Sequence, residues 1–157
     1  MWYKHWHTID RHERERLRAV IVSKLPEITK AAHDKGWPSS ALSRVMDYFY
    51  ADVRRVRGIS AVVINDEYLL LYVVGSSWWH DKPYICEEFL LSLTPGGDFP
   101  ACLAVIEALA KDEGCGAVCI GTAASPSNEV YARLLNRHGY KTLAYQLVKE
   151  IQLEQER

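Results

Sequence analysis

A glycine turn stands directly before a predicted helix, at residues 94–100 with the sequence TPGGDFP. The first backbone N–H groups of a helix have no partner inside the helix and carry partial positive charge, so such a turn often binds phosphate. Gly96 and Gly97 fit that chemistry, but Asp98 adds a negative charge and Phe99 adds a bulky ring. The stretch therefore has the glycines of an anion-binding turn, but its side chains weaken anion binding.

The cysteines, which could bind a metal or form a redox pair, show no metal-binding or redox spacing. Four cysteines occur, and no two of them form the C-x-x-C pair of a zinc knuckle or a redox motif: Cys86, Cys102, Cys115 and Cys119. We therefore expect no metal site and a reducing compartment. The formal net charge of -1 gives no signal for binding nucleic acid or an anionic membrane. No apolar run has the ~20 residues of a membrane span, so a cytoplasmic protein is expected.

The length and composition predict one packed domain. The chain has 157 residues, of which 48% are hydrophobic and 25% charged. We expect a single domain over residues 1–157. Residues 1–58 form an N-terminal arm and helices, and residues 59–151 form a sheet with its helices.

The N-terminal part contains helix signals. Asp10 followed by Glu13 resembles a capping box, and apolar residues then recur at helical spacing towards His33. Pro26 is expected to bend or restart that helix. A further helix is expected from Ser39 or Ser40 to Val53. Trp2, Tyr3 and Trp6 alternate with polar residues, which suits either a short first strand or an arm packed on a partner.

The remainder alternates between strand and helix signals. The hydrophobic pattern predicts strands at 59–64, 68–75, 84–93 and 116–122. It also predicts helices at 101–114 and 125–139, and one or two closing strands at 140–151. Asn65 and Asp66 suit a tight turn, and the strand at 116–122 is expected in the middle of a sheet. The fold class is therefore α/β, with a mixed α+β sheet. An antiparallel meander comes first, followed by parallel β-α-β connections.

Three local patterns occur in the order found in one known superfamily. EEFLLSL leads into the glycine turn and a helix ending AKDEG, and AVCIGT is followed by a loop. NEVYARLLNRHGYK at 128–141 matches N-x-x-A-x-x-L-Y-E-K-x-G-F at Asn128, Leu134, Arg137, Gly139 and Tyr140. Residues 59–150 thereby resemble the GNAT superfamily of acyl-CoA-dependent N-acyltransferases. The looser motifs are similar to those of bacteriophage GNAT-like proteins, which would place such a chain in host cytoplasm or virion.

The resemblance implies acetyl-CoA as co-substrate and a direct attack of an amine on the thioester. The strand before the glycine turn would part from its parallel neighbour, so that backbone groups near Leu91 and Leu93 bind the pantetheine arm. The turn at Gly96, Gly97, Asp98 and Phe99 would face the diphosphate. Asn128 would bond the coenzyme arm, with helix capping as the structural alternative.

The resemblance also implies a base and an acid. Glu87 or Glu88 would be the base; only one of two successive strand residues can face the cleft, and both could equally be solvated or paired. The usual tyrosine is replaced by Leu135, which leaves Tyr131, one turn earlier, as the candidate acid, or as a residue packed on the core. Trp78, Trp79 and His80 would shape the acceptor pocket, or fold onto the sheet.

Two functions remain open from the sequence. The first is an active N-acetyltransferase whose amine acceptor, a protein or a small molecule, is not identified. The second is a GNAT-fold protein without catalysis that serves as a structural or binding component, such as a phage virion or accessory protein. In that case Trp2, Tyr3 and Trp6 would dock on a virion partner or in a homodimer. The degraded turn, with Thr94 in place of a basic residue and Pro100 without an N–H, is the reason for keeping the second.

Overall fold

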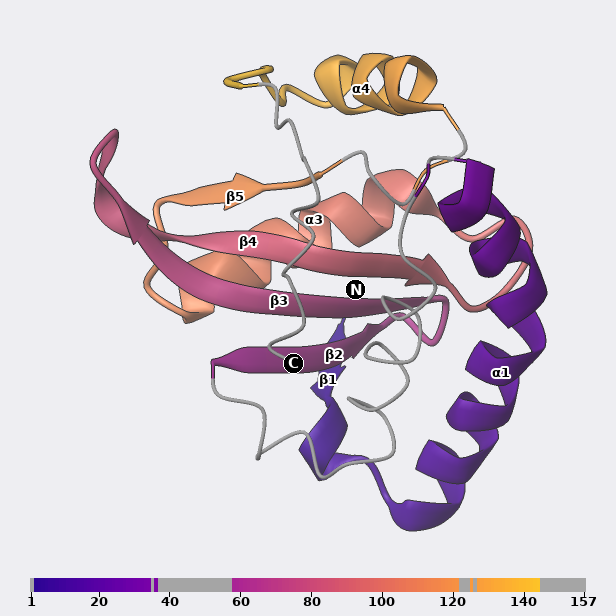
Figure 1. Cartoon of the computed structure of the whole chain (residues 1–157). Coiled ribbons are helices and arrows are strands. Elements are labelled where there is room, and N and C mark those ends of the chain that lie inside the picture. The colour runs from indigo at the N-terminus through magenta and orange to yellow at the C-terminus, as the bar shows by residue number, and fades with distance from the viewer. Residues whose placement is uncertain (1, 35, 37–57, 122–124, 126, 145–157) are drawn as a thin grey trace, which may run out of the picture.

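The computed structural model describes residues 2–34, 36, 58–121, 125 and 127–144. These residues form one five-stranded sheet in the order β1-β2-β3-β4-β5, with helices on both of its faces (Figure 1). The strands are β1 Tyr3–His5, β2 Ile59–Ile64, β3 Tyr68–Ser77, β4 His80–Ser92 and β5 Ala117–Cys119. The helices are η1 Trp6–Thr8, α1 Arg11–Asp34, α3 Phe99–Asp112 and α4 Asn128–Arg137.

The connectivity confirms the predicted mixed sheet. β1, β2, β3 and β4 pair antiparallel in sequence order, and β5 then pairs parallel to β4 after the α3 crossover. The Asn65–Asp66 turn between β2 and β3 has both residues at positive φ, 52° and 58°. That geometry matches the twist of the two flanking strands and is tolerated by Asn and Asp, as the sequence predicts.

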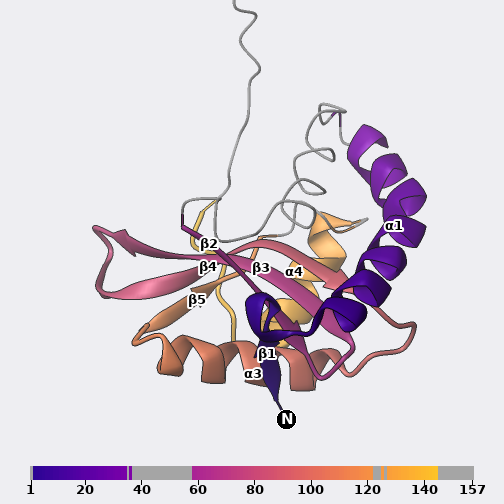
Figure 2. The same cartoon turned by 90° about the horizontal axis from the view of Figure 1, so that it is seen from below.

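Two apolar clusters build the core, one on each face of the sheet. One cluster packs α1 against the sheet through Leu17, Ile21, Leu69 and Leu71. The other packs α3 against the opposite face through residues such as Ile106 and Leu109. Figure 2 shows α1 and α3 on the two sides of the strands, and Figure 1 shows α4 beyond the β5 edge.

The first residues are part of this core rather than a free arm. Tyr3 and His5 pair with Ile64 and Val62, and Trp6 is only 2% exposed within the α1-side cluster. Of the two sequence alternatives, the short first strand is therefore the one that the structure shows. Trp6 is not available to dock on a partner.

α1 differs from its prediction in one respect. Asp10 caps it by accepting from the N–H of Glu13 at 2.9 Å, as the capping signal indicates. The helix then continues through Pro26 to Asp34, so the predicted restart at Pro26 is wrong. Its tertiary contacts on the sheet outweigh the local cost of the proline.

The later strands differ from their predictions in length and place. β3 and β4 extend into a long hairpin whose tip is Trp78 and Trp79, where a loop is expected from the sequence. β5 covers only Ala117–Cys119, is half-buried, and forms one edge of the sheet built by the described residues rather than its middle. Residues 140–144 form no strand, and both 145–151 and the helix expected at 39–53 lie outside the described residues.

No helix within the described ranges combines the length and the apolar character needed to cross a bilayer.

Candidate active site

A gap opens between β4 and β5 on the side of the sheet where α3 begins. The parallel ladder contains Tyr84↔Ala117, Ile85↔Val118 and Cys86↔Cys119, and within the described residues it goes no further. β4 continues to Ser92 without β5 beside it. The two strands therefore part after Cys86, which is the arrangement that the resemblance implies. We call this gap the wedge.

A bulge in β4 lies at the start of the wedge. Leu71 of β3 pairs with Phe89, and the next residue, Tyr72, pairs with Glu87, so Glu88 is an extra residue. The bulge changes which face the side chains take: Ile85 packs in the cluster on the α3 side, whereas Phe89 packs in the cluster on the α1 side. Glu87 is the last residue before this change.

The Glu87 carboxylate lies in the wedge and joins its two sides. Its Oε2 accepts a hydrogen bond of 3.0 Å from the backbone N–H of Gly121, just beyond β5. The backbone N–H of Leu90 on β4 also stabilises the carboxylate. Burial raises the pKa of Glu87 to about 7, helped by the nearby charge of Glu88, while these two N–H groups oppose the rise. Glu88, the other predicted base, is exposed.

The backbone groups predicted to bind the pantetheine arm were placed one residue too far along β4. The N–H of Leu93 donates to the carbonyl of Glu67 at 2.7 Å, on the β3 side. Alternate residues of an antiparallel strand face the same neighbour, so Leu91 also faces β3. The expectation for Leu91 and Leu93 is therefore wrong, and the residues between and before them, Leu90 and Ser92, turn their backbone towards the wedge.

Tyr131 of α4 reaches the same region. Its ring packs on the ring of Phe99 with centroids 5.8 Å apart, and Phe99 also packs on Tyr68 at 6.2 Å. Burial, followed by the nearby charge of Glu87, raises the pKa of Tyr131, so the phenol holds its proton. Leu135, at the usual tyrosine position, is buried in the core. The structure thus brings Glu87 and Tyr131 together without any shift of α4.

The glycine turn is closed by two carboxylates of the chain itself. Asp98 is the N-cap of α3, and its Oδ1 accepts from the N–H of Ala101 at 2.9 Å. The N–H of Asp98 donates to Oε2 of Glu67 at 3.1 Å. Pro100, in the first turn, has no N–H. Three positions that could donate to a phosphate in an open turn are thus bonded internally or lack an N–H: Asp98, Ala101 and Pro100.

A local structural reason explains why glycine occupies each of the positions 96 and 97. Gly96 has a φ of 72°, in the region that favours glycine. A Cβ on Gly97 would lie 3.0 Å from the Tyr68 ring. The small residue at 97 therefore makes room for an aromatic side chain of β3, and no ligand is needed to explain it.

The position of Asn128 separates its two sequence alternatives. Ser127 is the N-cap of α4, with its side chain accepting from the N–H of Val130 at 3.4 Å, and Asn128 is the first helical residue. The N-cap position itself is therefore taken by Ser127 and not by Asn128. Its contact with a coenzyme arm stays a prediction.

The structure does not bring Trp78, Trp79 and His80 to the wedge. The rise of an extended strand places His80 about 23 Å from Glu87 along β4. Trp78 is 97% exposed at the hairpin tip, and Trp79 packs on Tyr84 and His80. One of the two tryptophan rings is thus held by contacts within the hairpin, and a role of these residues in acceptor binding stays a prediction.

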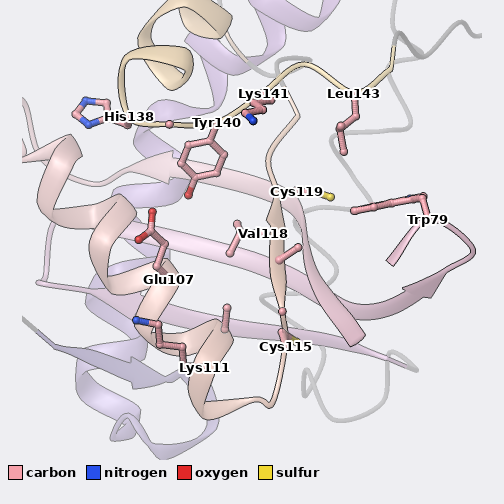
Figure 3. A pocket seen from close by; sticks show the side chains of 14 residues that line it. Trp79, Glu107, Lys111, Cys115, Val118, Cys119, His138, Tyr140, Lys141 and Leu143 are labelled. Carbon is pink, nitrogen blue, oxygen red and sulfur yellow. The ribbon is translucent and has the colours of Figure 1, made fainter. Parts of the chain in front are cut away.

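Trp79 instead borders a separate cavity on the outer side of β5. The cavity has a volume of about 460 Å³ and lies between α3, β5 and the segment after α4. Figure 3 shows Tyr140, Glu107, Lys111 and Lys141 around it. Neither Glu87 nor Tyr131 lines this cavity, so it is distinct from the wedge.

Sequence reasoning missed Glu67, Tyr68 and Gly121. Glu67 directly precedes β3 and Tyr68 is its first residue, both far in sequence from the glycine turn, and Gly121 lies in a stretch predicted to be a strand. Only the register of β3 on β4 brings the first two to residues 93–99, and no local pattern encodes that register.

The comparisons with solved structures agree on one fold. A protein described as a possible acetyltransferase from Clostridium difficile 630 superposes with a TM-score of 0.61 at 10% identity, covering 98% of each chain. AAC(6')-Iy, in complex with the bisubstrate analogue CoA-S-monomethyl-acetylneamine, gives a TM-score of 0.57 at 13% identity over 97% of this chain and 98% of its own. A GNAT family acetyltransferase from Staphylococcus aureus gives 0.52 at 14% identity over 96% and 98%. No protein-family model and no curated protein sequence matches the chain. At these identities the likeness is one of fold, and the fold is that of the GNAT acetyltransferases.

Proposed function

We propose that this chain, which has the GNAT acetyltransferase fold, is an N-acyltransferase that moves an acyl group from a pantetheine thioester, such as acetyl-CoA, to an amine. The observation that carries the proposal is the position of Glu87. A half-buried carboxylate with a pKa of about 7 stands where the β4–β5 ladder ends, and its charge acts on a protonated tyrosine, Tyr131. A strongly shifted group in such a gap is a candidate for acid–base chemistry.

The reaction needs one base, one acid and one oxyanion donor. The amine nitrogen forms a bond to the thioester carbon, and the carbon–sulfur bond breaks. Glu87 takes the proton that the amine loses, and the leaving thiolate takes a proton from Tyr131 or from water. The products are an amide and a free thiol. A base with a pKa near the operating pH combines a large ionised fraction with a useful proton affinity.

The backbone of β4 supplies the donor for the developing oxyanion. The N–H of Leu90 faces the wedge and stabilises the ionised Glu87 carboxylate in the structure described here. When Glu87 takes up the amine proton, its demand for that N–H falls. The N–H of Leu90 then becomes available to a tetrahedral oxyanion at the same place.

The acceptor is proposed only at the level of an amine. One protein of the same fold is described in complex with a bisubstrate analogue of CoA and acetylneamine, and others are described as aminoglycoside acetyltransferases. An aminoglycoside, a polyamine, a lysine peptide and a peptide with a free N-terminus form a suitable panel. Mass spectrometry of the acylated amine identifies the acceptor without interference from the four cysteines.

Glu87→Gln is the first test of the mechanism. Gln keeps an oxygen for the N–H of Gly121 but cannot take a proton at neutral pH, so kcat is expected to fall about 100-fold or more. Wild-type kcat/KM is expected to rise with pH through about 7, and this limb disappears in the variant. Glu88→Gln, the matched control on the exposed bulge residue, leaves kcat within about twofold. Equal activity of wild type and Glu87→Gln contradicts the role of Glu87.

The second candidate, a GNAT-fold protein without catalysis, is favoured by the closed glycine turn and by the contact of Phe99 with Tyr131. The melting temperature separates the two functions. A ligand at 100 times its Kd adds about 2.7 kcal/mol of stability, so a bound thioester raises the melting temperature. No shift with millimolar acetyl-CoA or millimolar acetyl-pantetheine favours the second candidate.

A further inference from the structure

We infer, as a refinement that rests on the proposed function, that Glu67 and Asp98 select against thioester donors carrying a diphosphate. The preferred donor is a pantetheine thioester without that group. The two carboxylates stand at the start of α3, whereas β4 beyond Cys86 has no β5 residue paired with it, and this is where the proposed function places the pantetheine amides. The start of α3 repels an anion, whereas the backbone groups of Leu90 and Ser92 along β4 are uncharged.

Glu67 is fixed over the glycine turn by two bonds. Its carbonyl accepts from the N–H of Leu93 at 2.7 Å, and its carboxylate accepts from the N–H of Asp98 at 3.1 Å. These bonds hold the two ends of the turn. Because the bond from Leu93 anchors the backbone of Glu67 at the end of the β3–β4 ladder, its carboxylate is held close to the turn.

Asp98 adds a second charge at the same point. Its carboxylate accepts from the N–H of Ala101 in the first turn, and Pro100 supplies no N–H. A diphosphate arriving here would have to displace one or both carboxylates from these N–H groups. It would also meet like charge at close range.

No ion pair recorded among the described residues involves these two carboxylates. The ion pairs among those residues lie on α1 and at the β3–β4 tip. The usual helper at the start of such a turn is basic or an amide, and this chain has Thr94 there. The helix dipole at the start of α3 is already used by Asp98.

The pantetheine arm does not meet this obstacle. Its two amides and its thioester are uncharged, and the wedge-facing backbone groups of Leu90 and Ser92 are neutral partners for them. The backbone groups along β4 therefore suit a thioester donor that carries amides. The two carboxylates at the start of α3 disfavour a donor in which a strongly anionic group follows the pantetheine arm.

The test compares acetyl-pantetheine with acetyl-CoA on the full chain, by binding in calorimetry and by turnover. We expect acetyl-pantetheine to bind at least as tightly as acetyl-CoA. The double variant Glu67→Gln with Asp98→Asn keeps both hydrogen-bond acceptors, and Asn is as good an N-cap as Asp, so the fold is retained. In that variant the affinity for acetyl-CoA rises about tenfold, while the affinity for acetyl-pantetheine changes less than about twofold.

Two controls separate charge from structure. Glu27→Gln removes one negative charge from the exposed face of α1, and it leaves the ratio of the two affinities unchanged. Salt screens exposed charges, so raising the ionic strength from 0.05 to 0.5 M narrows the difference between the donors in wild type and not in the double variant.

The outcomes are distinct for the inference and for the proposed function. Tighter binding of acetyl-CoA than of acetyl-pantetheine by wild type, or no change of the ratio in the double variant, overturns the inference and leaves the transferase in place. Absence of binding and turnover with both donors overturns the proposed function and the inference together.

Discussion

The raised pKa of Glu87 predicts a specific pH dependence of the free energy of unfolding. Its pKa is about 7 in the folded chain against a usual value of 4.5, so the folded state holds a proton that the unfolded state releases. The stability contributed by this group is full below pH 4.5 and is lost as the pH rises to about 7. The shift corresponds to about 3 kcal/mol at most.

Urea unfolding of wild type and Glu87→Gln at several pH values checks this. The difference in the free energy of unfolding is expected to move by about 3 kcal/mol in favour of the variant between pH 4.5 and 8. Parallel curves for the two proteins would mean that the carboxylate is solvated in the folded state. The carboxylate was predictable as a candidate from the sequence; its burial was not, because burial depends on the segment after β5 and on α4.

The structure gives Gly97 a different role from the one that the sequence indicates. Its place in a glycine turn indicates an anion site, yet its small size is needed by the Tyr68 ring. Gly97→Ala is expected to lower the free energy of unfolding by about 1–2 kcal/mol, since its Cβ would lie 3.0 Å from that ring.

A double-mutant cycle tests this assignment. In a Tyr68→Leu background the cost of Gly97→Ala falls below about 0.5 kcal/mol, because the contact is gone. Gly121→Ala is the control, since a Cβ there meets only an ordinary contact at 3.5 Å. An unchanged cost in the Tyr68→Leu background would leave the need for glycine at 97 unexplained by packing.

At the scale of elements, α1 carries a proline that its packing tolerates. Pro26 lies inside the helix and removes one backbone hydrogen bond, which costs about 3 kcal/mol in an exposed helix interior. Pro26→Ala is therefore expected to raise the free energy of unfolding by about 1–3 kcal/mol, measured in urea. Glu27→Ala, at the neighbouring exposed position, is expected to change it by less than about 0.5 kcal/mol. A loss of stability in Pro26→Ala would show that the proline shapes the helix to fit the sheet.

The order of the elements was predictable, and their ends were not. Hydrophobic periodicity located α1, the three-strand meander, α3, β5 and α4. α3 begins at Phe99 rather than 101, because Asp98 is its cap. The β3–β4 hairpin runs through the segment expected to be a loop with an aromatic tip, because the ladder between the strands continues past Gly75, where a Cβ would lie 3.1 Å from Tyr84. The bulge at Glu88 has no local signature, and it moved the wedge-facing backbone from Leu91 and Leu93 to their neighbours.

At the scale of the whole molecule, two tyrosines tie the sheet to the C-terminal end of α3. The hydroxyl of Tyr72 donates to Glu113 at 3.0 Å, and that of Tyr3 donates to Asp112 at 2.6 Å. Burial raises the pKa of Tyr72, and the bond to Asp112 raises the pKa of Tyr3 to about 12.

Tyr72→Phe is expected to destabilise the fold by about 1–2 kcal/mol, since a buried hydroxyl bonded to a carboxylate is lost. Tyr3→Phe, at a more exposed site, costs less than half as much. Thermal unfolding gives both values. A larger loss for Tyr3→Phe would reverse the order that burial implies. Neither bond could be read from the sequence, where the partners lie 41 and 109 positions apart.

The contrast between Trp6 and Trp78 has a practical consequence for spectroscopy. The first indole is 2% exposed and the second 97%. Fluorescence from Trp78 is open to acrylamide quenching in the native state and will change little when the chain denatures. Emission from Trp6 will be shielded and will shift to longer wavelength only when α1 leaves the sheet. With the remaining tryptophans replaced by phenylalanine, one indole reports the integrity of the core and the other reports anything that settles on the hairpin tip.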